Sequence, residues 1–200
     1  MLMNGIPSFR LEKDVINAEI DVLREMGVEF KCGVEVGEDI TIAQLREQGY
    51  KAFYIAIGAQ GGRMTGVPGE DAVGVETGVD FLRRVNLNEE GVKLSGKTVV
   101  IGGGNVAVDV ARTALRTGSS EVSMFCLESR DIMPAADDEV AEAEEEGIVV
   151  NNSWGPKEIL TENGKVTAVV FKKCISVLDE NQRFSPKYDE EELLTVPCDQ

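Results

Sequence analysis

The stretch Thr98-Val99-Val100-Ile101-Gly102-Gly103-Gly104-Asn105-Val106-Ala107 decides the fold of this 200-residue chain. Its first four residues predict a short strand, the glycines a tight turn, and residues 107–115 a helix. Gly102, Gly104 and Ala107 have G-x-G-x-x-A spacing, in which the first glycine permits the turn and the second lets the backbone approach a pyrophosphate. The small third residue lets the helix pack on its strand. The sequence therefore predicts a dinucleotide site at a helix N-terminus.

The residues that follow fit this interpretation. Apolar side chains recur every three or four residues along the predicted helix, at Val106, Ala107, Val110, Ala111 and Ala114. Residues 121–127 predict a second strand, and Glu128 follows it, somewhat beyond the roughly 20 residues expected between the glycines and a ribose-binding acid. A carboxylate there accepts hydrogen bonds from ribose hydroxyls and repels a 2′-phosphate. The alternative is an ordinary glycine-rich loop with a surface glutamate.

Composition excludes several classes of function. The chain has no histidine, which excludes Ser–His and Cys–His catalysis and His-ligated metals within it. Its four cysteines never have C-x-x-C spacing, so neither zinc nor a dithiol centre is indicated. The net charge of −16 argues against nucleic acid and anionic membranes as partners. Without a signal-peptide pattern or an apolar run near the roughly 20 residues of a membrane span, we expect a cytoplasmic protein.

Helices and strands are predicted to alternate along the chain. Before the glycine turn we expect helices at 12–26, 42–48 (capped by Thr41) and 78–85, and strands at 28–32 and 52–57, the second buried. After it we expect a helix at 137–146, a strand at 148–150, a hairpin around Asn163-Gly164 and a last strand at 193–196. This order predicts an α/β fold, a Rossmann-like doubly wound parallel sheet with an added antiparallel β segment.

Three local expectations concern polar side chains. Asn105, at the start of the helix, is expected to act as its N-cap, with cofactor binding as a second role. Asp109 and Arg112 are expected to form an i, i+3 pair within the helix. The acidic run 144–146 is expected to be a solvated face.

Several passages together resemble the glutamate synthase small subunit and its relatives among the pyridine nucleotide-disulfide oxidoreductase-like flavoproteins. They are Gly5–Leu11, Ile55–Ala59, Val67–Glu70, Gly102–Arg112, Arg130–Ala135 and Glu144–Gly147. The resemblance implies part of an FAD-dependent NAD(P)H oxidoreductase, in which NADH or NADPH passes hydride to FAD. It also implies three regions: a trailing part of an FAD-binding domain at 1–60, a connection at 61–97, and a nucleotide-binding domain at 98–200 with a hairpin excursion at about 155–196.

The chain departs from this family's pattern at two places. Ile57 stands where a threonine is usual, and Leu127 and Glu128 stand where paired arginines would clamp the 2′-phosphate of NADP. Arg130 remains as a candidate cofactor contact, equally explained as a partner of Glu128 or as a stacking surface for adenine. NAD(H) is therefore favoured, with NADP(H) as the alternative. The predicted cofactor-binding residues are Gly102, Gly103, Gly104, Asn105, Val106, Glu128, Arg130 and Gly58; no catalytic side chain and no metal ligand is predicted.

Two parts of the related enzymes have no counterpart in this sequence. They are a cysteine-rich region for iron–sulfur clusters and a G-x-G-x-x-G motif for FAD ahead of residue 58. We therefore expect a truncated piece with an incomplete FAD site, silent in catalysis by itself, whose partners are the FAD and iron–sulfur domains of a parent enzyme. A free-standing nucleotide-binding module is the alternative, with residues 1–60 supporting self-association. A methyltransferase is disfavoured by Ile101 and Ala107.

Overall fold

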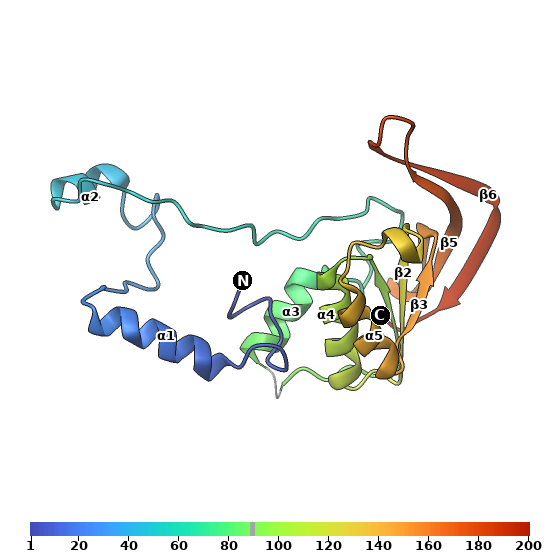
Figure 1. The fold of residues 1–200 in the computed structure, drawn as a ribbon, viewed down its shortest axis with the longest axis horizontal. Coiled ribbons are helices and arrows are strands. Elements are labelled where there is room, and N and C mark those ends of the chain that lie inside the picture. The colour runs from blue at the N-terminus through green and yellow to red at the C-terminus, as the bar shows by residue number, and fades with distance from the viewer. Residues whose placement is uncertain (89–90) are drawn as a thin grey trace.

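The computed structural model describes residues 1–88 and 91–200. Within them, one three-stranded sheet is parallel, with the order β1-β2-β3 and helical crossovers. Its strands are β1 (Lys97–Ile101), β2 (Glu121–Cys126) and β3 (Val149–Asn152). The helices α3 (Gly78–Leu87), α4 (Asn105–Arg116) and α5 (Asp137–Glu145) lie beside it in Figure 1. The strand–turn–helix prediction and the Rossmann-like α/β prediction are confirmed.

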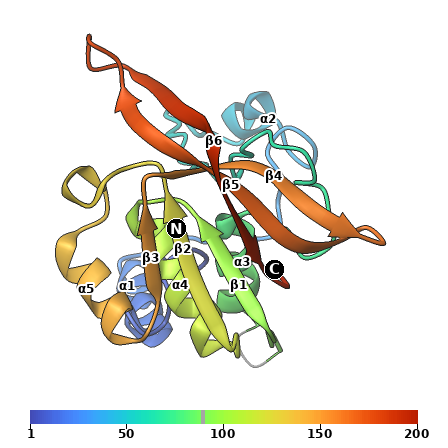
Figure 2. The same ribbon diagram turned by 90° about the vertical axis from the view of Figure 1, so that its right-hand side faces the viewer.

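A second sheet, antiparallel and in the order β4-β5-β6, crosses the parallel one (Figure 2). It consists of β4 (Trp154–Glu162), β5 (Lys165–Leu178) and β6 (Phe184–Pro197). The predicted Asn-Gly hairpin is confirmed, because Asn163 and Gly164 both have positive φ, 51° and 77°, as a two-residue hairpin turn requires. β6 begins nine residues before the predicted 193, since its polar residues pair with β5 while their side chains stay exposed.

Alternate residues of the parallel strands divide between two cores. Val100, Val122 and Met124 pack with the apolar side of α3, α4 and α5. Their neighbours along the strands, Val99, Ile101 and Phe125, pack instead against the antiparallel sheet. The Phe125 and Phe171 rings stack across the two sheets with centroids 4.1 Å apart. The parallel sheet is thus buried on both faces, by helices on one and by strands on the other.

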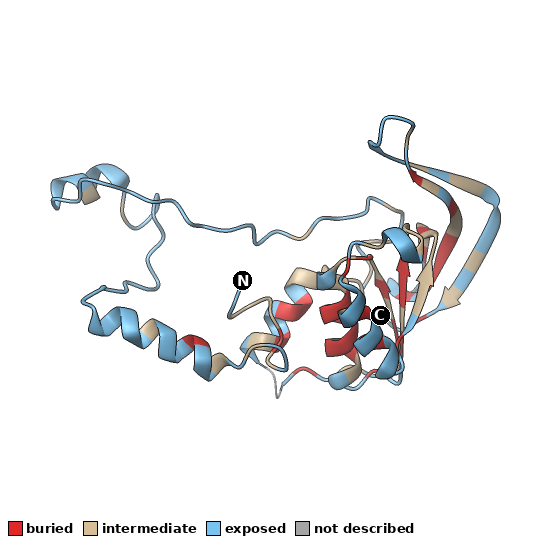
Figure 3. Ribbon diagram, viewed as in Figure 1, coloured by how far each residue is buried: buried red, intermediate tan, exposed pale blue. Residues whose placement is uncertain are grey.

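The region before residue 62 is built differently. Helices α1 (Lys13–Glu25) and α2 (Ile42–Glu47) form as predicted, α2 with a capping box at Thr41, but both extend away from the sheets (Figures 1 and 3). The strands predicted at 28–32 and 52–57 are wrong: both segments are irregular, and Ile57 is 83% exposed rather than buried. A strand needs a neighbour to complete its hydrogen bonds, and the described residues supply none to either segment.

One short segment ties this region to the half of the chain that contains the parallel sheet. The Arg10 guanidinium donates to both carboxylate oxygens of Asp109 at 2.9 and 3.0 Å, and also pairs with Glu139. Arg112 and Arg116 lie over the Phe9 ring, 4.9 and 4.3 Å from its centroid. Residues 9–10 therefore dock on α4 and α5.

The predicted pair between Asp109 and Arg112 is wrong. Asp109 pairs with Arg10, while Arg112 pairs with Glu142 and Glu146 of the neighbouring α5 segment. Glu146 also pairs with Arg116. The prediction that residues 144–146 form a solvated face is therefore only partly correct. Asp109 and Arg112 each bond to partners 30 or more residues away in the chain instead of to each other. They do so because α5 and residue 10 pack directly on α4.

None of the helices in the described part of the chain has the length and apolar character that a membrane crossing requires.

Removal of the Phe171 ring, which stacks on Phe125 of the other sheet, tests this architecture. Phe171 is fully buried, so Phe171→Ala is expected to lower the free energy of unfolding by about 3–5 kcal/mol, from lost contacts and the cavity left behind. The matched control is Phe184→Ala, whose ring is 68% exposed, with an expected loss below about 0.5 kcal/mol. Urea unfolding followed by circular dichroism measures both, and equal losses would contradict the packing described.

Candidate dinucleotide-binding site

The glycine turn lies at the carboxyl end of β1, between the strand and α4. Gly102 has φ 147°, and a Cβ placed on it would stand 3.2 Å from the Cβ of Ala107. Its backbone N–H donates to the Phe125 carbonyl at 2.9 Å, which fixes the turn to β2. The spacing of Gly102 and Ala107 therefore reflects the close approach of turn and helix that the motif requires.

The first turn of α4 is open toward a ligand. Gly104 is the N-cap, and no side chain within the described residues caps this helix. A Cβ on Gly104 would meet nothing within 4 Å, so the space beside its backbone is free. Unpaired N–H groups and the helix dipole favour an anion at such a position. A pyrophosphate fits this turn.

Asn105 does not cap the helix as predicted. It is the first helical residue, and its Oδ1 accepts a hydrogen bond from the Ala136 N–H at 2.8 Å. Gly103 is tied to the same loop, because its carbonyl accepts from the Ala135 N–H at 3.0 Å. The segment that leads into α5 is thus held against the glycine turn, and Asn105 has a structural role there.

Glu128 lies against the turn, where the sequence placed a ribose-binding carboxylate. A Cβ on Gly103 would come within 2.9 Å of Glu128 Oε2 and equally close to the Cβ of Cys126. Only a residue without a side chain lets the carboxylate come this near the turn. The structure therefore brings together Gly102, Gly103, Gly104 and Glu128, from the ends of two adjacent strands.

Arg130 and Gly58 stand apart from this group. The ion pair described for Arg130 is with Glu144 at 3.4 Å, not with Glu128, and both side chains are nearly half exposed. Such a surface pair contributes little and is readily exchanged. Gly58 lies in the exposed segment at 50–61, outside the residues that line the cleft beside the turn.

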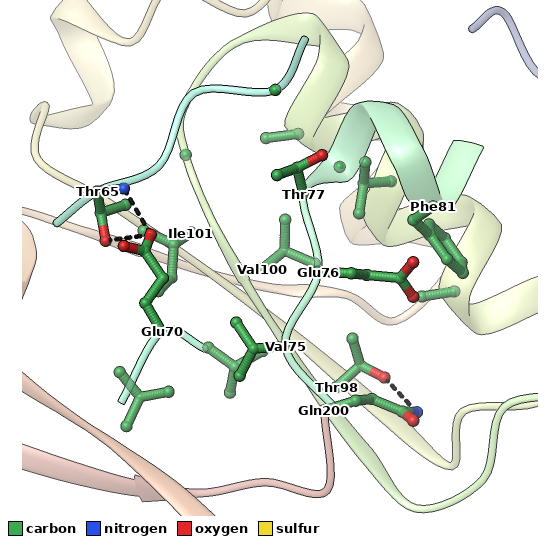
Figure 4. Close-up of a pocket in the computed structure, with 18 of the residues that line it drawn as sticks. Thr65, Glu70, Val75, Glu76, Thr77, Phe81, Thr98, Val100, Ile101 and Gln200 are labelled. Carbon is green, nitrogen blue, oxygen red and sulfur yellow. Dashed lines mark hydrogen bonds between the residues drawn. The ribbon is translucent and has the colours of Figure 1, made fainter. Parts of the chain in front are cut away.

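A cleft of about 420 Å³ lies beside the turn, and Glu128 is not among the residues that line it. One wall is β1 with Gly102, Gly104 and Val106, and the other is the connection at 62–79 (Figure 4). Glu70 organises that connection: its carboxylate accepts from the Thr65 hydroxyl and the Gly66 N–H, both at 2.8 Å. Burial opposes ionisation of Glu70, but these hydrogen bonds outweigh it and lower its pKa.

The sequence did not indicate that the connection forms a wall of the cleft. Val67–Glu70 carries part of the resemblance, which does not place it beside β1. In the structure it is held there by backbone hydrogen bonds to the β4–β5 hairpin, from Ile159 to Pro68 and between Val73 and residues 164 and 166.

The parallel sheet with its glycine turn defines a Rossmann-like α/β domain. Residues 38–179 match the pyridine nucleotide-disulphide oxidoreductase family, and the chain belongs to that family.

Relatives with curated names are longer proteins. The chain is 38% identical to the NADP(+)-dependent formate dehydrogenase subunit beta of Moorella thermoacetica and 36% identical to the glutamate synthase [NADPH] small chain of Halomonas elongata. Both matches cover the whole chain, but only 28% and 44% of those proteins. The chain is also 36% identical, over 83% of its length, to the NAD-dependent dihydropyrimidine dehydrogenase subunit PreT of Escherichia coli K12, of which it covers 39%. It thus spans less than half the length of these three relatives.

The fold recurs in a solved structure. Mycobacterium tuberculosis FprA in complex with NADPH superposes with a TM-score of 0.78 at 22% identity, over 99% of this chain and 59% of that one. The arrangement of helices and sheets is therefore that of a known fold.

Filling the open space at Gly104 tests the turn as a binding site. Because Gly104 has φ −96° and no neighbour near its missing Cβ, Gly104→Ala is expected to leave Tm within about 2 °C. It is expected to weaken nucleotide binding about tenfold or more, since the methyl group occupies the space that a pyrophosphate needs. Gly61→Ala, at another unobstructed glycine, is the control. Fluorescence titration measures binding, and unchanged affinity in Gly104→Ala would exclude the turn as the phosphate site.

Proposed function

We propose that this chain is the nicotinamide-dinucleotide-binding part of an FAD-dependent NAD(P)H oxidoreductase that resembles the glutamate synthase small subunit. The observation that carries the proposal is the close approach of the Glu128 carboxylate to the backbone of Gly103, beside the open first turn of α4. It combines a pyrophosphate cradle with a ribose-binding carboxylate in one continuous surface. The names of the relatives, all of them dehydrogenase or synthase subunits, support the same assignment.

The dinucleotide crosses the glycine turn. Its adenosine ribose lies at Glu128, its pyrophosphate lies over Gly104 and the N-terminus of α4, and its nicotinamide half points toward the cleft between β1 and residues 62–79. Ligands of open α/β sheets bind outside the carboxyl ends of the strands, which is where this path runs. Val106 and the apolar wall of the cleft then shield the reacting end from water.

The chain's own role is binding and orientation. The nicotinamide carries a hydride, and a flavin held by a neighbouring FAD domain accepts it. Face-to-face transfer of this kind needs no side-chain acid or base, in keeping with a site built from glycines, one carboxylate and backbone N–H groups.

The flavin site involves parts beyond this chain. We assign residues 1–60 to the trailing part of an FAD-binding domain, 61–97 to the connection and 98–200 to the nucleotide-binding domain. Exposed apolar side chains support this division: Met26, Tyr54, Ile55 and Ile57 are between 75% and 95% exposed. Tyr54, Ile55 and Ile57 follow one another closely in the chain, and exposed apolar side chains that adjoin in this way mark interfaces. The remainder of the FAD domain covers them in this proposal; in the alternative, a free-standing interaction module, a second copy of the chain does.

NAD(H) is the favoured nucleotide. The carboxylate of Glu128 accepts from both ribose hydroxyls and repels a 2′-phosphate. NADP(H) is the second candidate, because the names of two of the three relatives carry NADP or NADPH, and because the weak pair between Arg130 and Glu144 leaves a guanidinium two residues from Glu128. The two candidates differ in which residue governs binding.

Parallel titrations with NADH and NADPH decide between them. The unchanged chain is expected to prefer NADH, and Glu128→Arg is expected to weaken NADH binding by about 10- to 100-fold, the value of a hydrogen-bonded charge. Glu145→Arg, at an exposed position elsewhere on the acidic surface, makes the same change in net charge and is the control. Preference for NADPH, lost on Arg130→Ala, would assign selectivity to Arg130. Binding of neither nucleotide, by a chain shown to be folded, would contradict the proposed function.

A further inference from the structure

The backbone carbonyl of Glu128 is held by the end of the adjacent strand. It accepts a hydrogen bond from the Ser153 N–H at 3.0 Å and another from the Asn152 side-chain amide at 3.2 Å. The Cys126 thiol is a third, weaker donor to the same oxygen, with its Sγ 3.6 Å away. One hydrogen bond would satisfy this partly buried acceptor, whereas donors from two sides fix its direction.

Asn152 joins three parts of the site through one amide. Besides the Glu128 carbonyl, its Nδ2 lies 3.2 Å from the Cys126 Sγ at the end of β2 and 3.7 Å from the Met133 Sδ in the segment before α5. Cys126 in turn lies under Gly103. The side chain therefore spans the space between β2, the Glu128 loop and the segment that closes over the glycine turn.

Ser153 connects this arrangement to the antiparallel sheet. It has a φ of 63°, an uncommon conformation for a residue other than glycine. In it the Ser153 N–H reaches Glu128 while the Ser153 carbonyl accepts from the Cys174 N–H of β5 at 2.8 Å. A continuous path of hydrogen bonds thus runs from β5 through the corner between β3 and β4 to the loop that carries Glu128.

We propose that Asn152 is a specificity-determining positioning residue, which holds the Glu128 carboxylate where it distinguishes the adenosine ribose of NADH from the 2′-phosphate of NADPH. This inference rests on the proposed function. Asn152 acts through the backbone of Glu128. The hydrogen bonds described for its Nδ2 go to the Glu128 carbonyl and to two sulfur atoms, not to the Glu128 carboxylate. Its effect is on selectivity between nucleotides.

The test is a double-mutant cycle on the full 200-residue chain, with NADH and NADPH as probes. Asn152→Leu, of similar size but without donors, is expected to lower the ratio of NADH to NADPH affinity about three- to tenfold, the worth of one hydrogen bond. In the Glu128→Gln background the same substitution is expected to leave the ratio unchanged, because the group that Asn152 positions has lost its charge.

The matched control is Asn151→Leu on the same strand. Its amide donates to the Met124 and Val149 carbonyls, away from Glu128, so it is expected to cost stability without changing the ratio. All titrations are run well below each variant's Tm. An unchanged ratio in Asn152→Leu, or an equal change in the Glu128→Gln background, would overturn the role of Asn152 while leaving the nucleotide site intact. Failure of the unchanged chain to bind either nucleotide would overturn the proposed function itself.

Discussion

Phe125 is the residue on which the rest of the structure depends. Its ring stacks on Phe171 and holds the two sheets together, while its carbonyl accepts the hydrogen bond from the Gly102 N–H. Cys126, the last residue of the same strand, and Glu128, just beyond it, lie under and beside Gly103. Packing in the core therefore sets the height of the glycine turn over the sheet and the position of the carboxylate next to it. Because interiors are close-packed, a shift at this stack is passed to the site.

The features that the sequence predicted are those with local causes. Periodic apolar residues predicted α4, the G-x-G-x-x-A spacing predicted the turn, and Asn163-Gly164 predicted a hairpin that needs two positive φ angles. Features with distant causes were missed. Residues 52–57 have strand composition but no neighbouring strand in the described chain, and Asp109 bonds Arg10, 99 residues away. No pattern in the sequence indicated a role for Asn152, because that role depends on contacts with three segments that only the fold brings together.

The charge distribution explains why backbone groups carry the predicted phosphate site. The chain has a net charge of −16, and the arginines on and beside α4 are already paired: Arg10 with Asp109 and Glu139, Arg112 with Glu142 and Glu146, and Arg116 with Glu146. Their positive charges are neutralised on the flank of the helix, away from its first turn. An anion approaching Gly104 therefore meets the helix dipole and N–H groups, whose contribution is short-ranged and insensitive to distant acidic residues.

The docking of Phe9 and Arg10 on α4 and α5 has a mechanical consequence. Residues 9–10 are fixed to α4 and α5, and residues 62–79 are fixed along β1 and the β4–β5 hairpin. The chain between them is therefore clamped at both ends. Residues 13–58 therefore form a loop whose two ends are fixed, and whatever packs on them stays tethered to the half of the chain that contains the glycine turn. Because residues 68 and 73 are hydrogen-bonded to the β4–β5 hairpin, a movement of that loop leaves this wall of the cleft in place.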